Sequence, residues 1–277
     1  MRRLVLIGTI LALLMSGGIA VAQGVDRFPA NIIPSGEDIL VPSEAIDHSD
    51  TLEAITIVHY LEGFGKPITE CGNQICEPGE KKSCPSDCGG NGNGGGDKVP
   101  DCYKFMSKGA KLKNTEDLYI HPLVDLNVIG SSALEWDQNT SFSLFGSQTN
   151  DPEANFDPVL MPDGKNEFSF GNYTTSGVIA VARVWGYFSG PPQNREISQF
   201  DIMFDIDFVW GDAGMDPSVM DLQNIATHEI GHGLGLSDLY EDACSEVTMY
   251  GYSSEGEMNK RSLELADIAG LQELYGE

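Results

Sequence analysis

Basic residues are scarce in this 277-residue chain. Its 16 lysines and arginines face 42 aspartates and glutamates, which gives a formal net charge of -26. A surface of this charge repels the phosphates of DNA and RNA and the head groups of anionic membranes. We therefore exclude nucleic acid as a partner. The same acidity fits calcium-binding loops, a saline habitat or simple solubility, and composition does not separate these readings.

Long hydrophobic runs are also missing. The apolar run Leu4 to Met15 has twelve residues, and no later segment approaches the roughly 20 that a membrane-spanning helix needs. This run follows Arg2 and Arg3 and precedes Ala20-Val21-Ala22, the arrangement of a secretory signal peptide. The sequence predicts a signal peptide over 1–22, a secreted protein and no membrane span after cleavage. A retained N-terminal anchor is the alternative.

The next part of the chain consists of three segments that differ in composition. Residues 23–70 carry weak signals, and we interpret them as a loosely structured leader and a candidate propeptide that could block a cleft. Residues 71–88 hold four cysteines in a segment too short to build a core without covalent links, and residues 89–98 form a glycine-rich linker. We expect a small disulfide-rich module in which these cysteines pair with each other, and a zinc knuckle is the alternative. The four cysteines are Cys71, Cys76, Cys84 and Cys88.

Residues 99–277 have the composition and hydrophobic pattern of one globular domain. Val178 to Trp185 and Ile202 to Trp210 are strand candidates, and the second alternates an apolar with a mostly acidic face. Two cysteines remain for this domain, Cys102 and Cys244. In an oxidising compartment they are expected to pair, which would pin the start of the domain to a distant loop, whereas two free thiols are the alternative.

A metal-binding pattern lies on the predicted helix after these strands. Asp216-Pro217 predicts the helix start, and glycines after His232 predict its end. His228 and His232 are four residues apart, so both imidazoles project from one face of the helix, about 6 Å apart along its axis. Glu229 follows the first histidine. A bare match of this kind also arises by chance on solvent-facing helices, but the capped helix, the upstream strand and the secreted context favour a metal site.

The two histidines leave a transition metal weakly held, and the following residues offer a third ligand. Gly235 can take a positive φ and reverse the chain, which lets Asp238, three positions later, reach back toward the helix. A zinc ion on two neutral imidazoles and one carboxylate keeps a position for water and lowers the pKa of that water toward about 7. Glu229 is then placed to take a proton from the water and return it to a leaving amine.

The pattern His228-Glu229-x-x-His232-x-x-Gly235-x-x-Asp238, with Thr248-Met249-Tyr250 after it, resembles the metzincin zinc peptidases. The ending Leu265 to Gly276 is similar to the C-terminal helix of the matrixin branch. The resemblance implies an α/β (α+β) catalytic domain with a twisted, mostly parallel sheet, an active-site helix, a methionine turn and a C-terminal helix. It also implies His228, His232 and Asp238 as zinc ligands, Glu229 as the base and Met249 as an apolar floor. Most metzincins have histidine at the position of Asp238, and aspartate there resembles the snapalysin-like variation.

The functional expectation is a secreted zinc endopeptidase acting on protein or peptide substrates with one catalytic zinc ion. A catalytically silent zinc scaffold is one alternative, although retention of Glu229 argues against it. A zinc amidase acting on non-protein amides is another. Calcium is a further candidate cofactor because acidic residues cluster before the helix, but a solvated strand face explains part of this cluster, namely Asp201, Asp205, Asp207, Asp212 and Asp216.

Overall fold

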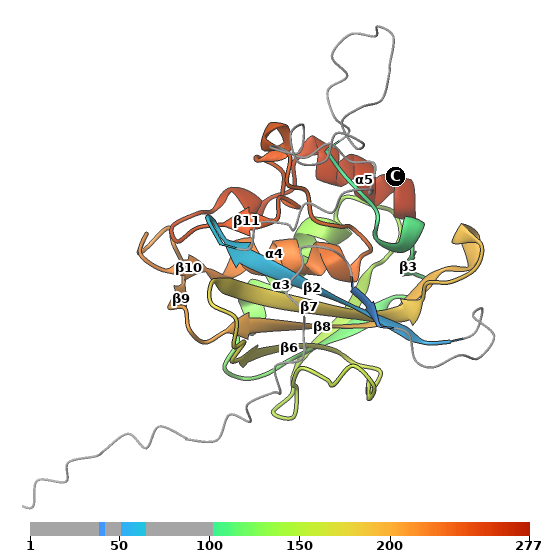
Figure 1. Ribbon diagram of the computed structural model, residues 1–277, viewed down its shortest axis with the longest axis horizontal. Coiled ribbons are helices and arrows are strands. Elements are labelled where there is room, and N and C mark those ends of the chain that lie inside the picture. Colours follow the sequence, from blue (N-terminus) through green and yellow to red (C-terminus); the bar gives the residue numbers. More distant parts are fainter. Residues whose placement is uncertain (1–38, 42–50, 65–101) are drawn as a thin grey trace, which may run out of the picture.

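The computed structural model describes residues 39–41, 51–64 and 102–277 (Figure 1). The predicted signal peptide, the four cysteines at 71, 76, 84 and 88 and the glycine-rich linker lie outside the described residues. No helix within the described ranges is long and apolar enough to cross a membrane.

A mixed β-sheet forms the frame of the molecule, with helices packed against it (Figure 1). Its main path runs β1-β2-β7-β8-β6-β4-β5, and five of its eight strand pairings are parallel. The mostly parallel sheet predicted from the resemblance is therefore confirmed. The strands are β1 (Ile39–Val41), β2 (Glu53–Leu61), β3 (Lys111–Leu112), β4 (Glu116–Ile120), β5 (Phe145–Asn150), β6 (Asn166–Gly171), β7 (Val178–Tyr187), β8 (Glu196–Asp205) and β11 (Tyr252–Ser253), with β9 (Trp210–Gly211) and β10 (Met220–Asp221) as a separate pair.

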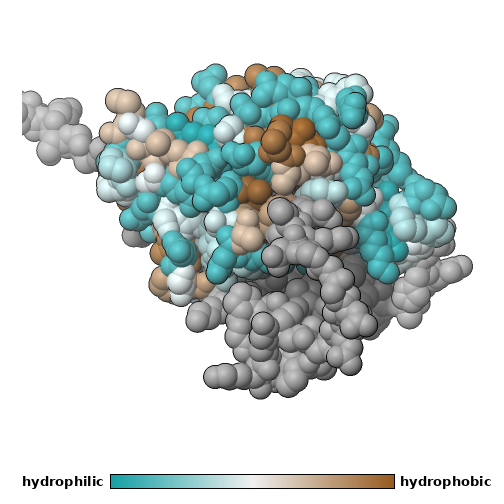
Figure 2. Space-filling view, turned by 90° about the horizontal axis from the view of Figure 1, so that it is seen from above, coloured by the Kyte–Doolittle hydropathy of each residue, from teal (hydrophilic) through white to brown (hydrophobic). Residues whose placement is uncertain are grey.

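The described residues include three α-helices. They are α3 (Leu126–Asp137), α4 (Leu222–Gly233) and α5 (Leu265–Tyr275). Short 3-10 helices occupy Met106–Lys108, Pro192–Asn194, Asp242–Cys244 and Asn259–Arg261. The core between sheet and helices contains α4 residues such as Ile225 and Ile230, both fully buried. On the face seen in Figure 2, hydrophilic side chains cover most of the described surface.

Two element boundaries differ from the sequence prediction. The strand expected to run to Trp210 ends at Asp205, whose carboxylate accepts the backbone N–H of Asp207 and turns the chain. The helix expected to start at Asp216-Pro217 starts at Leu222. Asp221 is its N-cap and accepts the N–H of Asn224 over 2.8 Å, whereas Asp216 caps a local turn at Ser218.

The expectation of a loosely structured leader is wrong for Glu53–Leu61. These residues form β2, which pairs antiparallel with β7 from Glu53 to Tyr60 and parallel with β11 at Tyr60 and Leu61. The run contains alternating and β-branched residues suited to a strand buried on both faces. Ile55 and Ile57 enter the main core, whereas Val58 and Tyr60 pack in a second cluster on the other face. In Figure 1, β2 lies along β7 and its end reaches β11.

Candidate metal and catalytic site

Helix α4 carries the first two predicted ligands on its inner face. The Nε2 atoms of His228 and His232 lie 3.1 Å apart, and both side chains are fully buried. The other ring nitrogen of each histidine faces a backbone carbonyl: Nδ1 of His228 lies 2.7 Å from Thr248 O, and Nδ1 of His232 lies 2.9 Å from Leu236 O. A carbonyl only accepts, so each Nδ1 carries a proton, and each ring in its neutral form presents an Nε2 lone pair.

The chain reversal after α4 brings the third predicted residue to the same point. Gly235 adopts a φ of 100°, and a Cβ there would lie 2.2 Å from the carbonyl oxygen of Ala110. A side chain at this position is therefore excluded by both conformation and space. After this turn, Oδ1 of Asp238 lies 3.1 Å from His228 Nε2 and 3.4 Å from His232 Nε2.

These three atoms fit a tetrahedral metal ion. Their separations of 3.1 Å to 3.4 Å are close to the edge of about 3.3 Å to about 3.6 Å that bonds of about 2.0–2.2 Å produce. Asp238 Oδ1 is buried without a hydrogen-bond partner among the described residues. Two converging lone pairs and one such carboxylate oxygen call for a cation, and imidazole with carboxylate is a zinc ligand set. His228, His232 and Asp238 are thus brought together as expected.

Burial and mutual charge set the pKa values in this cluster. Burial raises the pKa of Glu229 to about 8 and lowers that of His228. Burial also disfavours the charged forms of Asp238 and His232, but their mutual attraction outweighs it, so the pKa of Asp238 lies well below its usual value and that of His232 rises to about 9. A bound cation would likewise favour the ionised carboxylate.

Met249, which the resemblance implies as an apolar floor, packs against Gly231 of α4. It is 1% exposed, and a Cβ on Gly231 of α4 would lie only 2.3 Å from its Sδ. The first turn of α5 holds the methionine turn in place, because Asp267 accepts the backbone N–H groups of Thr248 and Met249 over 2.9 Å and 3.3 Å. Sequence reasoning did not single out Asp267, although its place at N3 of a capping box is a local signal.

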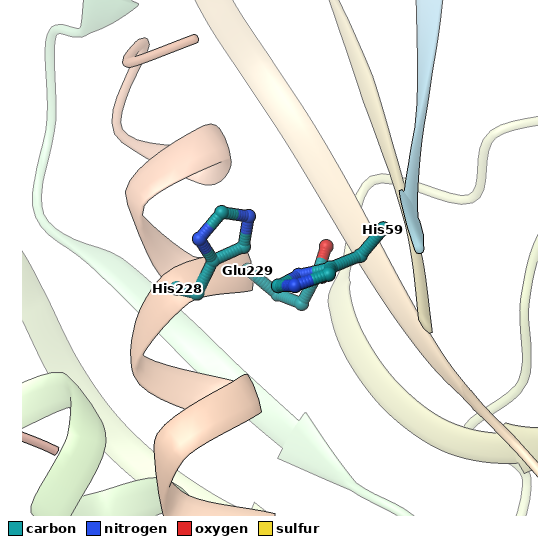
Figure 3. Close-up of side chains that lie close together, drawn as sticks. All are labelled: His59, His228 and Glu229. Atoms are coloured by element: carbon teal, nitrogen blue, oxygen red, sulfur yellow. The ribbon is translucent and has the colours of Figure 1, made fainter. Parts of the chain in front are cut away.

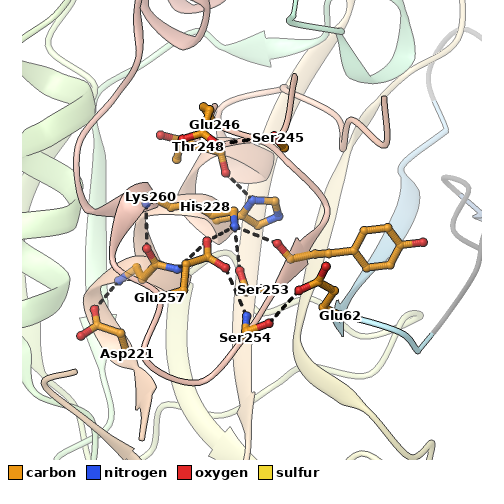
Figure 4. A network of polar contacts seen from close by, with 12 residues as sticks. Glu62, Asp221, His228, Ser245, Glu246, Thr248, Ser253, Ser254, Glu257 and Lys260 are labelled. Atoms are coloured by element: carbon orange, nitrogen blue, oxygen red, sulfur yellow. Dashed lines mark hydrogen bonds and ion pairs between the residues drawn. The ribbon is translucent and has the colours of Figure 1, made fainter. Parts of the chain in front are cut away.

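Three further side chains at the site were also missed. Tyr240 donates its hydroxyl to Asp238 Oδ2 over 3.0 Å. His59 of β2 points toward α4 and lies beside Glu229 and His228 (Figure 3), with its Nδ1 3.0 Å from Glu229 Oε1. Lys260, 1% exposed, donates to Ser253 Oγ over 2.8 Å in the network of Figure 4. The contact of His59 is too distant in sequence for any local pattern to predict.

The other predicted residues are placed as follows. Cys102 and Cys244 form a disulfide with a Cα–Cα distance of 5.4 Å, which confirms the predicted pair. Tyr252, which follows the methionine turn and was not predicted, stacks edge to face with Tyr240. The acidic cluster proposed for calcium does not converge: Asp212 pairs with Arg261, while Asp205 and Asp216 accept backbone N–H groups of their own turns.

A comparison with known families agrees with this geometry. The matrixin peptidase family model matches residues 184–276, a range that contains β8, α4, the methionine turn and α5. The match supports a matrixin-like metzincin catalytic domain over this region. The match supports a zinc metallopeptidase in general, with protein as the class of substrate.

Proposed function

We propose that the protein is a secreted zinc endopeptidase in which His228, His232 and Asp238 hold the metal and Glu229 is the general base. The observation that carries the proposal is the convergence of two Nε2 lone pairs and an unpartnered Asp238 oxygen, with the carboxyl group of Glu229 beside them on the same helix. Zinc bound there supplies Lewis-acid polarisation of the peptide carbonyl and acidifies a water molecule.

The chain's own residues divide the remaining work. The carbonyl oxygens of Thr248 and Leu236 fix the two imidazoles, and Tyr240 fixes the carboxylate of Asp238. Glu229 follows His228 on α4, and its Oε2 is buried without a hydrogen-bond partner among the described residues. A carboxylate so placed takes a proton from the attacking water and delivers it to the nitrogen of the leaving amine.

We also propose the outer organisation of the chain. Residues 1–22 are the signal peptide, 23–70 the leader, 71–88 a disulfide-rich module, 89–98 the linker and 99–277 the catalytic domain. The Cys102–Cys244 disulfide supports export to an oxidising compartment, where such bonds persist. The described part of the leader, β2, adds a strand to the sheet of the catalytic domain.

The decisive experiment compares wild type with Glu229→Ala, using a mixed peptide library and protein that has been cut within 89–98 and separated from its N-terminal fragment. Wild type should cleave internal peptide bonds, and a zinc chelator should stop cleavage. Glu229→Ala should keep the wild-type zinc content while turnover falls by a factor on the order of 10² to 10⁴, because ligands and base are separate residues. Glu255→Ala, an exposed glutamate, serves as the control. Unchanged turnover in Glu229→Ala would contradict the mechanism.

A further inference from the structure

Strand β2 fills a slot between two backbone edges that border the candidate site. On one side it pairs with β7. On the other side it pairs with β1 from Ala54 to Thr56 and with β11 at Tyr60 and Leu61, and Glu62 N donates to Ser253 O over 2.9 Å. The edges of β7 and β11 belong to the segment 102–277, whereas β1 and β2 precede the linker. Main-chain pairing of this kind accepts any extended peptide, because its hydrogen bonds do not depend on side-chain identity. The slot is thus built for a peptide strand.

The pairing is irregular at the residue that enters the site. The register between β2 and β7 shifts between His59 and Tyr60, and such bulges redirect a side chain. The ring of His59 is fully buried, with its centroid 4.1 Å from that of His228. The group that β2 places against Glu229 is therefore the imidazole of His59.

Hydrogen bonds fix the orientation of this imidazole. Lys260 donates to Ser253 Oγ, so the Ser253 hydroxyl is free to donate to His59 Nε2, 3.1 Å away. Nδ1 of His59 then carries the proton and donates it to Glu229 Oε1 over 3.0 Å (Figure 3). Burial lowers the pKa of His59 well below its usual value, which agrees with a neutral ring.

We propose that β2 is a self-blocking strand that occupies the place of an extended peptide substrate, and that His59 closes the site by binding the carboxylate of Glu229. This inference rests on the proposed peptidase function. The imidazole occupies the space beside Glu229 and binds Oε1, one of the two oxygens of the proposed base, so a water molecule cannot use that oxygen. Activity then requires release of β2 after the chain is cut before Cys102.

The test uses the full chain with a specific protease site inserted at 89–96. After cutting, only non-covalent contacts hold the N-terminal fragment, and its dissociation rate can be measured with a fluorescent label. His59→Ala should release the fragment about tenfold faster or more, because a buried hydrogen bond is lost and Glu229 Oε1 is left without this partner. His59→Asn, which can keep a donor near the Nδ1 position, should recover part of this loss. Val58→Ala, on the opposite face of β2, is the matched control.

A double-mutant cycle separates the contact with Glu229 from general loosening of the strand. In a Glu229→Ala background, His59→Ala should accelerate release much less than in wild type, whereas the effect of Val58→Ala should be the same in both backgrounds. Equal effects of His59→Ala in both backgrounds would overturn the role of His59. Equal peptidase activity before and after fragment release would overturn the blocking. Normal release with no chelator-sensitive activity would instead contradict the proposed function and leave the strand contact standing.

A second group of side chains points to a separate ligand. Ligand atoms of Asp157, Asp163 and Glu167 lie within 4.8 Å of one another. Glu167 is on β6, directly opposite Asp201 of β8, and both are fully buried. Oε1 of Glu167 has no hydrogen-bond partner among the described residues, although its Oε2 accepts from Asn155 N.

The nearby cations and donors are used elsewhere. Arg183 donates to the backbone oxygen of Asp157 and to Thr56, and Lys165 binds Asp151 over 2.9 Å while its distance to Asp163 is 3.9 Å. Gln199 donates to Asp157 Oδ2 and Asp201 Oδ1. The buried oxygen of Glu167 is left facing other carboxylates, which is costly without a compensating positive charge.

We further infer that Asp157, Asp163 and Glu167 bind a hard divalent cation, with Ca²⁺ as the best match to an all-oxygen donor set. Asp163 is exposed and gives the ion a way in. Zinc-loaded protein should bind one added Ca²⁺ per chain in equilibrium dialysis, and its melting temperature should rise. Glu167→Gln should abolish both effects, and Glu153→Gln, an exposed neighbour in the same loop, should keep them. Failure of Ca²⁺, Mg²⁺ and Mn²⁺ to bind or to raise the melting temperature would overturn this site.

Discussion

The Tyr240 hydroxyl donates to Oδ2 of Asp238 over 3.0 Å, which leaves Oδ1 facing the two imidazoles of α4. The carboxylate would otherwise be free to rotate about its terminal torsion. A hydrogen-bond donor outside the ligand set therefore determines which oxygen the metal meets. Partners of this kind orient a ligand without touching the ion.

Tyr240→Phe should accordingly weaken zinc binding while the fold persists. Loss of such a partner typically lowers metal affinity by about 10-fold to about 100-fold. Competition with a chromogenic chelator measures the affinity, and circular dichroism checks the fold. Tyr187→Phe, a partly exposed tyrosine on β7, is the control. Equal zinc affinity in Tyr240→Phe and wild type would show that the hydroxyl does not position Asp238.

Asp238 itself is the second target. Asp238→Ala should lower zinc affinity sharply and abolish peptidase activity, because the remaining imidazole pair holds a transition metal weakly. Asp238→His should restore part of the binding, since the turn at Gly235 already delivers position 238 to the metal and imidazole is an equally good zinc ligand. Metal analysis after dialysis at neutral pH decides between the outcomes. Full zinc and wild-type turnover in Asp238→Ala would place the third ligand elsewhere.

Gly231 offers a test of the packing beneath the site. A Cβ there would lie 2.3 Å from Met249 Sδ and 2.9 Å from Cζ2 of Trp136. Gly231→Ala should therefore destabilise the protein by about 1–3 kcal/mol through overpacking. The double variant Gly231→Ala/Met249→Ala should lose less stability than the sum of the losses in the two single variants, because the added methyl group then has space. Denaturant unfolding of the three variants measures this coupling. Strict additivity would mean that the two side chains do not compete for space.

The parts of the site that could be predicted from sequence are local. His228, Glu229 and His232 follow helical spacing, and the positive φ of Gly235 follows from the need to reverse the chain. The start of α4 was misplaced because the Asp216-Pro217 signal competes with the true cap at Asp221, which stands next to the helix. In both cases the deciding interactions lie within a few residues of chain.

The contacts that could not be predicted are distant in sequence. His59 and Glu229 are 170 positions apart, and no periodicity of β2 indicates which strand it pairs with or what its histidine meets. A histidine within a β-branched run was the only available signal. Likewise, Glu167 and Asp201 are opposed by strand register, which is set by the whole sheet. Their burial could not be read from the acidic composition.

The disulfide supplies a prediction on stability. Cys102 and Cys244 are separated by 142 positions, so the bond closes a long loop in the unfolded chain. Replacing both with serine should lower the free energy of unfolding by about 2–5 kcal/mol. The double variant avoids a single reactive thiol, and guanidinium unfolding compares it with wild type at equal zinc content. An unchanged unfolding midpoint would mean that the bond does not restrict the unfolded chain in this way.

The stability of the protein should depend on pH because Glu167 and Asp201 are buried. Their burial determines the direction of this dependence. Burial raises the pKa of Glu167 to about 7 and that of Asp201 to about 8. A hydrogen bond from the Asn155 backbone lowers the pKa of Glu167, and hydrogen bonds from the Asp157 backbone and the Gln199 side chain lower that of Asp201. The charge of Asp157 raises both pKa values, and the charge of Asp163 raises that of Glu167. Between about pH 4, where the unfolded carboxylates titrate, and about pH 8, the folded state holds more protons than the unfolded state. Stability should therefore be greatest at the acidic end of this window and fall as pH rises to about 8, in protein without added calcium.

Glu167→Gln isolates this contribution because its amide remains neutral. Denaturant unfolding at pH 5, 6, 7 and 8 should show a smaller loss of stability in Glu167→Gln than in wild type. Ca²⁺ in excess should flatten the wild-type profile, since a bound cation favours the ionised carboxylates and removes their excess protons from the folded state. The Glu153→Gln control should follow wild type throughout. If the stability of the wild type instead rises across this window, and neither Glu167→Gln nor Ca²⁺ changes it, the carboxylates are already ionised in the folded protein and their charge is balanced by other groups.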